Sequence, residues 1–410
     1  MASDAASPAR PVSLWSEAKA LAASPMAPFY FIVASVTVLV LVGSLMVLSA
    51  SSVLAQATED GPYYFIIRQL QFLVVGVAAA VVLSRLKPDY LRRLAWPAWT
   101  LAVVLLILVV VMGAEINGNR NWLAFGRFQF QPSEFAKLAL VVWCGAVFHI
   151  KRGRLHEPAQ LAIPLVPLGG LILALVLAGK DLGTGLIIGA ILVMVLFFVG
   201  TSMRVLVPLG ALALGLVGLL VYGSGNRMDR ISIFLNPESN TDLSSQPMAA
   251  LYGLASGGWW GLGLGASKQK WGGLKTGAHT DYIFAVIGEE LGLFGVLLII
   301  ALFALLGWAG LEVAIRSDAM FNKVVAAGIT GWFLVQAVIN IFVVLHLLPV
   351  LGVPLPFVSY GGSALLSSLM AVGVLLALAR DTPEARAFIA SRRRKARPRM
   401  TSVMAATKED

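Results

Sequence analysis

Long apolar runs separated by short polar connections dominate the chain from residue 29 onward. A helix needs about 20 mostly apolar residues to cross a bilayer core, and on that criterion the pattern predicts about ten spans. They are expected at residues 29–55, 64–84, 95–113, 135–150, 161–178, 182–200, 203–222, 282–307, 324–347 and 357–379. The predicted fold is therefore an all-α, polytopic integral membrane protein. Residues 29–380 form its transmembrane domain, between a polar N-terminal tail (1–28) and a basic C-terminal tail (381–410).

Basic residues lie in every second connection between the predicted spans. They occur at residues 85–93, 151–154, 204 and 316–323, and again in the tail at 392–399. Because Lys and Arg mark the cytoplasmic side of membrane proteins, both termini are predicted to be cytoplasmic and the other connections to face outward.

The composition agrees with this picture and removes other classes. Apolar residues make up 58% of the chain and charged residues 13%, which argues against a soluble domain and against disorder. The net charge of +10 is better explained by contact with anionic membrane lipids than by nucleic acid. One cysteine, Cys144, and four scattered histidines give no disulfide and no metal site.

One large outward loop, residues 223–280, separates the seventh and eighth predicted spans. Loops of this length are usually functional or disordered. It combines tryptophans with cations, which suits a ligand with an apolar tail and an anionic head, although a lid over the bundle is the alternative. These residues are Trp259, Trp260, Trp271, Arg227, Arg230, Lys268, Lys270 and Lys275.

Acidic residues near the eighth span are the main candidates for chemistry. Thr280 or Asp281 could cap the helix, but a carboxylate at a membrane boundary also suits a general base. Glu289 and Glu290 lie within the apolar run, where a buried acid is either functional or paired. Adjacent positions point in different directions on a helix, so each glutamate needs its own partner.

Two other span starts carry charge, and one segment between spans cannot be helical. Glu134 with Lys137, and Asp181 after Lys180, read either as helix starts with a local charge pair or as functional groups. Residues 348–356 are apolar but rich in proline, and irregular backbone at membrane depth needs protein or a cavity around it. The Gly-rich turn at 359–363 could offer free N–H groups to an anion.

Several short motifs, taken in order, resemble those of the SEDS family (shape, elongation, division and sporulation) of bacterial membrane proteins. They are Asn117-Gly118-x-Arg120-x-Trp122, Gln131-Pro132-Ser133-Glu134-x-x-Lys137, Asp181-Leu182-Gly183-Thr184, Ser256-Gly257-Gly258, Gly261-x-Gly263-x-Gly265, His279-Thr280-Asp281-Tyr282-Ile283-Phe284-Ala285, Glu289-Glu290-x-Gly292 and Leu348-Pro349-x-x-Gly352-x-Pro354-Leu355-Pro356-Phe357-x-Ser359-Tyr360-Gly361-Gly362-Ser363. Residues 286–292 are more similar to division members than to elongation members. The chain departs from the family at Asn121, usually arginine, at Lys180, usually proline, and at 274–277, which replaces a Leu-Pro-Glu segment.

The resemblance implies a ten-helix peptidoglycan glycosyltransferase that polymerises lipid II at the outer face of the bacterial cytoplasmic membrane. It also implies a class B penicillin-binding protein as partner, other division proteins, undecaprenyl-linked glycan as donor, and a place at the division septum. A lipid II flippase, an elongation polymerase and a scaffold for the transpeptidase are the alternatives. The absence of an inverted repeat argues against a transporter.

Site roles follow from the resemblance as hypotheses. Asp281 matches the family's catalytic aspartate and would act as the base. Arg120, Lys137 and Lys270 are candidates for binding the pyrophosphate, together with His279, Ser359, Gly361 and Gly362. Glu134, Asp181, Glu289 and Glu290 are assigned supporting roles. No cofactor is evident, and a divalent cation could assist at the pyrophosphate without a dedicated site.

Overall fold

The computed structural model describes residues 23–57, 61–116, 119–126, 128–154, 157–223, 225–237, 241–274 and 277–396. Several sequence predictions fall on residues outside these ranges. They concern most of the N-terminal tail, Asn117 and Gly118 of the first motif, Lys275, and the tail beyond residue 396.

Within the described residues, nine helices are long and apolar enough to cross a membrane. They are α2 (Ala27–Ala57), α3 (Tyr64–Arg85), α4 (Pro88–Met112), α5 (Pro132–Ile150), α8 (Leu182–Val199), α9 (Met203–Tyr222), α12 (Ile283–Arg316), α13 (Met320–Val344) and α14 (Gly362–Arg380). A tenth apolar segment is interrupted: α6 (Pro158–Pro164) passes through a π-helical turn into α7 (Gly170–Ala178). The prediction of an all-α polytopic membrane protein is confirmed.

The helix limits differ from the predicted ones where prolines stand. α4 begins at Pro88, and not at residue 95, because proline at the first helical position and Asp89 in the first turn favour a start there. The last span begins at Gly362, and not at residue 357, since residues 348–361 form no helix. We refer to residues 345–361, between α13 and α14, as the proline loop.

A small antiparallel sheet between α4 and α5 was not predicted. Its strands are β1 (Ala114–Ile116), β2 (Asn119–Phe125) and β3 (Phe128–Phe130), in the order β1-β2-β3. Two of the strands have only three residues, and the seven residues of β2 do not alternate between polar and apolar. Gly126, with φ of +61°, makes the turn between the second and third strands.

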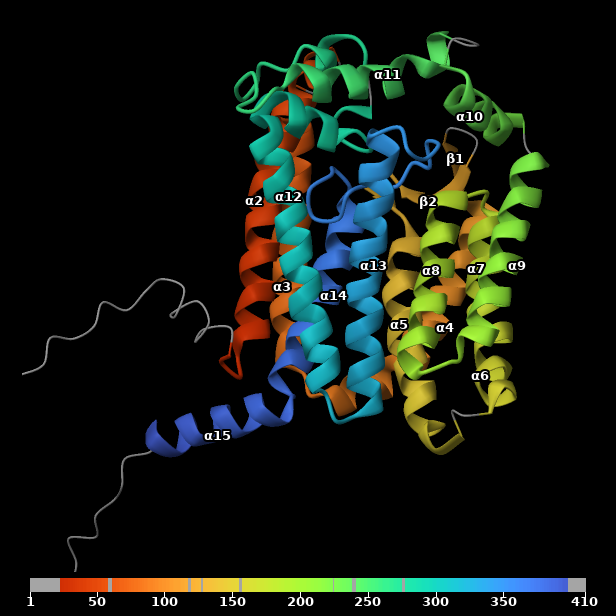
Figure 1. The fold of residues 1–410 in the computed structure, drawn as a ribbon, viewed down its shortest axis with the longest axis vertical. Helices are drawn as coiled ribbons and strands as arrows, with labels where there is room; N and C mark the ends of the chain where they lie inside the picture. The colour runs from red at the N-terminus through yellow and green to blue at the C-terminus, as the bar shows by residue number, and fades with distance from the viewer. Residues whose placement is uncertain are drawn as a thin grey trace, which may run out of the picture.

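The large loop lies across one end of the bundle, with α10 (Gly225–Leu235) and α11 (Thr241–Ser256) over the helix ends (Figure 1). Helix α15 (Pro383–Ala396) extends away from the opposite end of the bundle (Figure 1). The polar residues singled out from the sequence gather under α10 and α11 or deeper between α5, α13 and α14.

Candidate functional site

Asp281 lies in a turn directly before α12. The residue at the capping position is Tyr282, which makes no side-chain capping bond, and the Thr280 hydroxyl donates to the Gly277 carbonyl instead. Asp281 is therefore outside the helix, and the capping alternative for this pair is wrong.

The Asp281 carboxylate is half-buried and faces the proline loop. A Cβ added to Gly352, whose φ is +69°, would lie 3.8 Å from Asp281 Oδ2, so this glycine places bare backbone beside the carboxylate. In the described part of the chain we find no side chain that donates a hydrogen bond to these oxygens. Burial raises the pKa of Asp281 to about 6, while the positive charge of Arg230 on α10 pulls it down.

The C-terminal end of the proline loop is hydrogen-bonded to the segment that precedes Asp281. The Ser359 hydroxyl donates to the Thr280 carbonyl at 2.7 Å and accepts from the Leu355 N–H at 2.8 Å. The Tyr360 N–H donates to the His279 carbonyl at 2.9 Å. The Gly361 N–H donates to Gln69 Oε1 at 3.3 Å, so two of the N–H groups expected to bind an anion here, those of Tyr360 and Gly361, already have protein partners.

Gly362 and His279 complete this side of the site through packing. A Cβ at Gly362 would overlap the Phe72 ring, so α14 approaches α3 closely at this position. The His279 ring packs against Phe65 and Tyr360, with centroids 4.7 and 5.3 Å away. Burial lowers the pKa of His279 to about 4, so the ring is neutral at physiological pH.

Lys270, Glu289 and Glu290 form a second cluster, which fixes the large loop to α12 and α2. Lys270 Nζ lies 3.0 Å from Glu290 Oε1, and Ser49 of α2 donates to the same carboxylate at 2.7 Å. Glu289 accepts from the Ser267 hydroxyl at 2.6 Å and from the Lys268 N–H at 2.8 Å. The two glutamates thus have separate partners, as adjacent helical positions require.

A break in α12 at Gly292 makes this attachment possible. Gly292 has φ of +66° and ψ of −163°, which interrupts the helical bonding. The carbonyls of Glu289 and Glu290 then accept from the N–H groups of Leu262 and Gly263, at 2.9 and 3.0 Å. Gly257 and Gly261 of the glycine-rich motif are therefore explained by close backbone contact with α12, and the other three glycines at 258, 263 and 265 by their positive φ angles.

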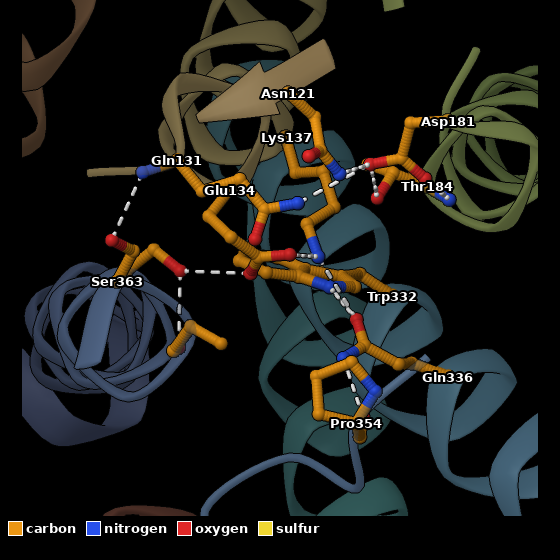
Figure 2. Close-up of polar contacts among 12 residues, drawn as sticks. Asn121, Gln131, Glu134, Lys137, Asp181, Thr184, Trp332, Gln336, Pro354 and Ser363 are labelled. Carbon is orange, nitrogen blue, oxygen red and sulfur yellow. Dashed lines mark hydrogen bonds and ion pairs between the residues drawn. The ribbon is translucent and has the colours of Figure 1, made fainter. Parts of the chain in front are cut away.

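Lys137 lies in a third cluster, inside the bundle (Figure 2). Its side chain is 1% exposed, and its ammonium contacts Glu134 Oε1 at 2.8 Å and Gln336 Oε1 at 3.0 Å (Figure 2). It also lies 4.7 Å from the centre of the Trp332 ring, and Ser367 donates to the other Glu134 oxygen at 3.3 Å. Lys137 is thus fully partnered within the protein, and its contact with a pyrophosphate stays a prediction.

Asp181 caps α8 beside the small sheet. One oxygen accepts from the Thr184 N–H at 2.9 Å. The other accepts from the Thr184 hydroxyl, Asn121 and Gln131 at 2.8, 3.0 and 3.2 Å (Figure 2). Arg120 lies on the same strand as Asn121 but is not buried. Its side chain is 45% exposed, and its guanidinium is 3.9 Å from the Glu115 carboxylate.

Two contributors to the Asp281 site are not predicted from the sequence. Arg230, one of several loop cations, donates to the Val350 carbonyl of the proline loop at 3.2 Å and lowers the pKa of Asp281. Gly352 was noted only as part of a motif. No pattern along the chain tells which loop cation reaches the site, because α10 must first fold back over the bundle.

The structure therefore brings together Asp281, His279, Ser359, Gly361 and Arg230, and it places Lys270 and Lys137 in separate buried ion pairs. A carboxylate with a raised pKa and no hydrogen-bond donor among the described residues, at the end of the bundle that α10 and α11 cover, can accept a proton from a hydroxyl. In the described residues there is no group of three or more His, Cys, Asp or Glu that could hold a metal ion.

Comparison with known proteins identifies the family of this chain. The model of the FtsW, RodA and SpoVE family, described as cell cycle proteins, matches residues 29–384. "Probable peptidoglycan glycosyltransferase FtsW" of Trichlorobacter lovleyi is 39% identical over 337 residues, which are 82% of this chain and 88% of that protein. The Mycobacterium tuberculosis protein of the same name is 36% identical over 88% of this chain and 69% of its own length. Stage V sporulation protein E of Bacillus subtilis is 36% identical over 86% of this chain and 97% of its own.

Solved structures show the same fold. A chain from the structure described as "Structural coordination of polymerization and crosslinking by a peptidoglycan synthase complex" matches with a TM-score of 0.72 and 30% identity, over 86% of this chain and 98% of that one. The rod shape determining protein RodA of Thermus thermophilus matches with a TM-score of 0.64 and 28% identity, over 86% and 96% of the two chains. The predicted family is confirmed: this chain belongs to the FtsW/RodA/SpoVE family of cell cycle proteins.

Proposed function

We propose that this protein is a peptidoglycan glycosyltransferase that polymerises lipid II into β-1,4 glycan at the outer face of the cytoplasmic membrane. The similarity to relatives with the name peptidoglycan glycosyltransferase supports the reaction class. The observation that carries the proposal is Asp281: a carboxylate with no donor on its oxygens among the described residues, beside the bare backbone of Gly352, with a pKa raised to about 6.

In this mechanism Asp281 accepts the proton of the GlcNAc 4-hydroxyl of lipid II as that oxygen attacks the anomeric carbon of the growing chain. The bond from that carbon to the pyrophosphate oxygen breaks, and undecaprenyl pyrophosphate leaves. A single displacement inverts the α-linked donor to a β-linkage without a covalent enzyme intermediate. General-base assistance of this kind contributes about 10²–10⁴-fold.

Cations stabilise the charge that develops on the pyrophosphate. Arg120 and Arg230 suit this task because both side chains are reachable from the outer side. Lys137 and Lys270 are 1–2% exposed in their ion pairs, which favours indirect support through Glu134 and Glu290. A divalent cation bound with the substrate could share the pyrophosphate charge.

The biological setting is part of the same proposal. The structural neighbour named as a synthase complex for polymerization and crosslinking supports a class B penicillin-binding protein as partner. The division-type names of the relatives support a septal location with other division proteins. The distribution of Lys and Arg supports cytoplasmic termini and contact of the basic tail, 381–410, with membrane lipids.

The test is polymerisation of purified lipid II by the protein with its transpeptidase partner, comparing wild type with Asp281→Ala. We expect glycan polymer from the wild type and none from the variant, with both proteins folded and bound to the partner. Polymer from the variant at the wild-type rate would exclude Asp281 as the base. Polymer from neither would direct the next experiment to lipid II transport in sealed vesicles.

A further inference from the structure

One buried amide joins the backbone of Asp281 to the proline loop. Asn340, on α13, is 1% exposed, and its two side-chain N–H groups have different targets. Asn340 Nδ2 lies 2.9 Å from the Asp281 carbonyl oxygen and 2.8 Å from the Val353 carbonyl oxygen. A single planar group therefore fixes the spacing between the residue that carries the carboxylate and the loop that faces it.

A second amide supports the same loop from one helical turn earlier. Gln336 lies four residues before Asn340, hence on the same face of α13. Its Nε2 donates to the Pro354 carbonyl at 2.9 Å, while its Oε1 accepts from Lys137 and from Trp332 Nε1 (Figure 2). The buried ion pair of Lys137 thus holds Gln336 in the orientation that it needs to reach the loop.

These carbonyls have few other ways to be satisfied. Buried backbone oxygens need a donor, and prolines 354 and 356 have no N–H groups with which the loop could bond to itself. The Val353 carbonyl is one residue from Gly352, whose backbone faces Asp281 Oδ2. A change in the Asn340 contact would therefore move the loop relative to the carboxylate.

We propose that Asn340 is a positioning residue for Asp281, which sets the gap between the carboxylate and the proline loop, with Gln336 as its support. This inference rests on the proposed function, since it concerns the geometry of the same base. Asn340 touches no reacting atom in this proposal. It affects the rate because it determines the position of Asp281. It affects the acid limb of the pH profile because it limits how much water reaches the carboxylate.

The experiment compares Asn340→Leu and Asn340→Asp with wild type, as complexes with the partner, in lipid II polymerisation between pH 5 and 8. Both variants lose the two N–H donors and keep the number of side-chain heavy atoms. We expect kcat to fall by about 10²-fold in each, as for a misplacement of about 1 Å, with KM for lipid II changed much less. The acid limb should move to lower pH in Asn340→Leu, because the loosened site admits water, and to higher pH in Asn340→Asp, because a second carboxylate opposes the ionisation of Asp281.

Asn322 provides the matched control on the same helix. It is 2% exposed, donates to Asp381 at 2.9 Å, and like Asn340 has a buried Oδ1 without a partner among the described residues. It lies 18 residues away, about 27 Å along the helix. Asn322→Leu should lower the unfolding temperature and leave kcat and the acid limb unchanged.

The inference is overturned if the Asn340 variants match Asn322→Leu in kcat and pH profile. If Asn340→Leu does not fold, Asn340→Asp decides the question through kcat: a merely structural role lowers the unfolding temperature but leaves kcat of the folded protein at the wild-type value, whereas a positioning role lowers kcat with KM little changed. The proposed function is tested separately: polymerisation by Asp281→Ala would reject the base itself, whereas an inactive Asp281→Ala with normal Asn340 variants rejects only the positioning role.

Discussion

Asp181 and Asp281 are the same residue type in similar places, each just before a membrane helix and each close to a backbone carbonyl that an arginine of α10 contacts. The Asp181 carboxylate caps α8 and accepts four hydrogen bonds from Thr184, Asn121 and Gln131. The Asp281 carboxylate caps nothing and lies beside Gly352. Arg227 donates to the carbonyl next to Asp181, at Lys180, and Arg230 donates to the proline loop beside Asp281.

The difference separates a structural carboxylate from a reactive one. Donors that fill every oxygen hold Asp181 in place and leave it little capacity to accept a substrate proton. Burial without donors disfavours the charge on Asp281 and raises its pKa into the range useful for a base near neutral pH. The predictions below test this contrast, from the largest expected effect to the smallest.

The first prediction removes the base while keeping its shape. Asp281→Asn should lower kcat by about 10²–10⁴-fold, because the amide cannot accept the hydroxyl proton. Thermal unfolding should occur at the same temperature or higher, since a buried charge with no donor is lost. The measurement is polymer length and yield from lipid II at pH 7.5. A rate within tenfold of wild type would remove the contrast between the two aspartates.

The second prediction concerns the fully partnered cluster at Lys137. Lys137→Met leaves the Glu134 carboxylate buried without its cation, which should destabilise the protein by about 3–5 kcal/mol. The double variant Lys137→Met/Glu134→Gln should recover most of that loss, as followed by thermal unfolding in detergent. If the double variant is stable but makes no glycan, Lys137 contributes to the reaction itself, either at the pyrophosphate or through Gln336 and the proline loop.

These two clusters also show what could be predicted from the sequence. The spans followed from apolar length alone, and Asp281 and the Glu134–Lys137 pair stood out as charges at span boundaries. The partners of Lys270, Asn340 and Arg230 could not be predicted from the sequence. Each partner lies far from its residue along the chain, and each contact depends on how α10, α12 and α13 pack. The small sheet was missed since three-residue strands give no readable alternation.

The third prediction tests the other side of the contrast. Asp181→Asn turns an N–H toward the donors of Asn121 and Gln131, so we expect a loss of about 1–3 kcal/mol in stability. The rate per folded molecule should change less than about tenfold, because no proton passes through this residue. Thermal unfolding and polymerisation by the folded fraction measure the two effects. A loss of rate equal to that of Asp281→Asn would make Asp181 part of the reactive site.

The fourth prediction uses pH in the wild type. With the pKa of Asp281 at about 6, kcat/KM should fall about tenfold for each pH unit below that value, as the base becomes protonated. Stability should change in the opposite direction. The pKa of this carboxyl is about 6 in the folded protein and 3.8 in an unfolded chain, so the folded state binds the proton more tightly. This group therefore stabilises the fold increasingly as the pH falls from above 6 towards 4. A flat rate profile between pH 5 and 7 would contradict the assignment.

The smallest effect is expected from the cation that the sequence analysis did not single out. Arg230 lowers the pKa of Asp281, so Arg230→Gln should move the acid limb to higher pH by less than one unit. At pH 8 Asp281 is ionised in both proteins, so any loss of rate there measures the contribution of Arg230 at the pyrophosphate. Because Arg230 is exposed, added salt should reduce the difference between wild type and variant. Arg227→Gln is the matched control on α10, since Arg227 donates to the carbonyls of Leu220 and Lys180. Equal shifts in the two variants would mean that the net charge of α10, and not the place of Arg230 over the proline loop, tunes the base.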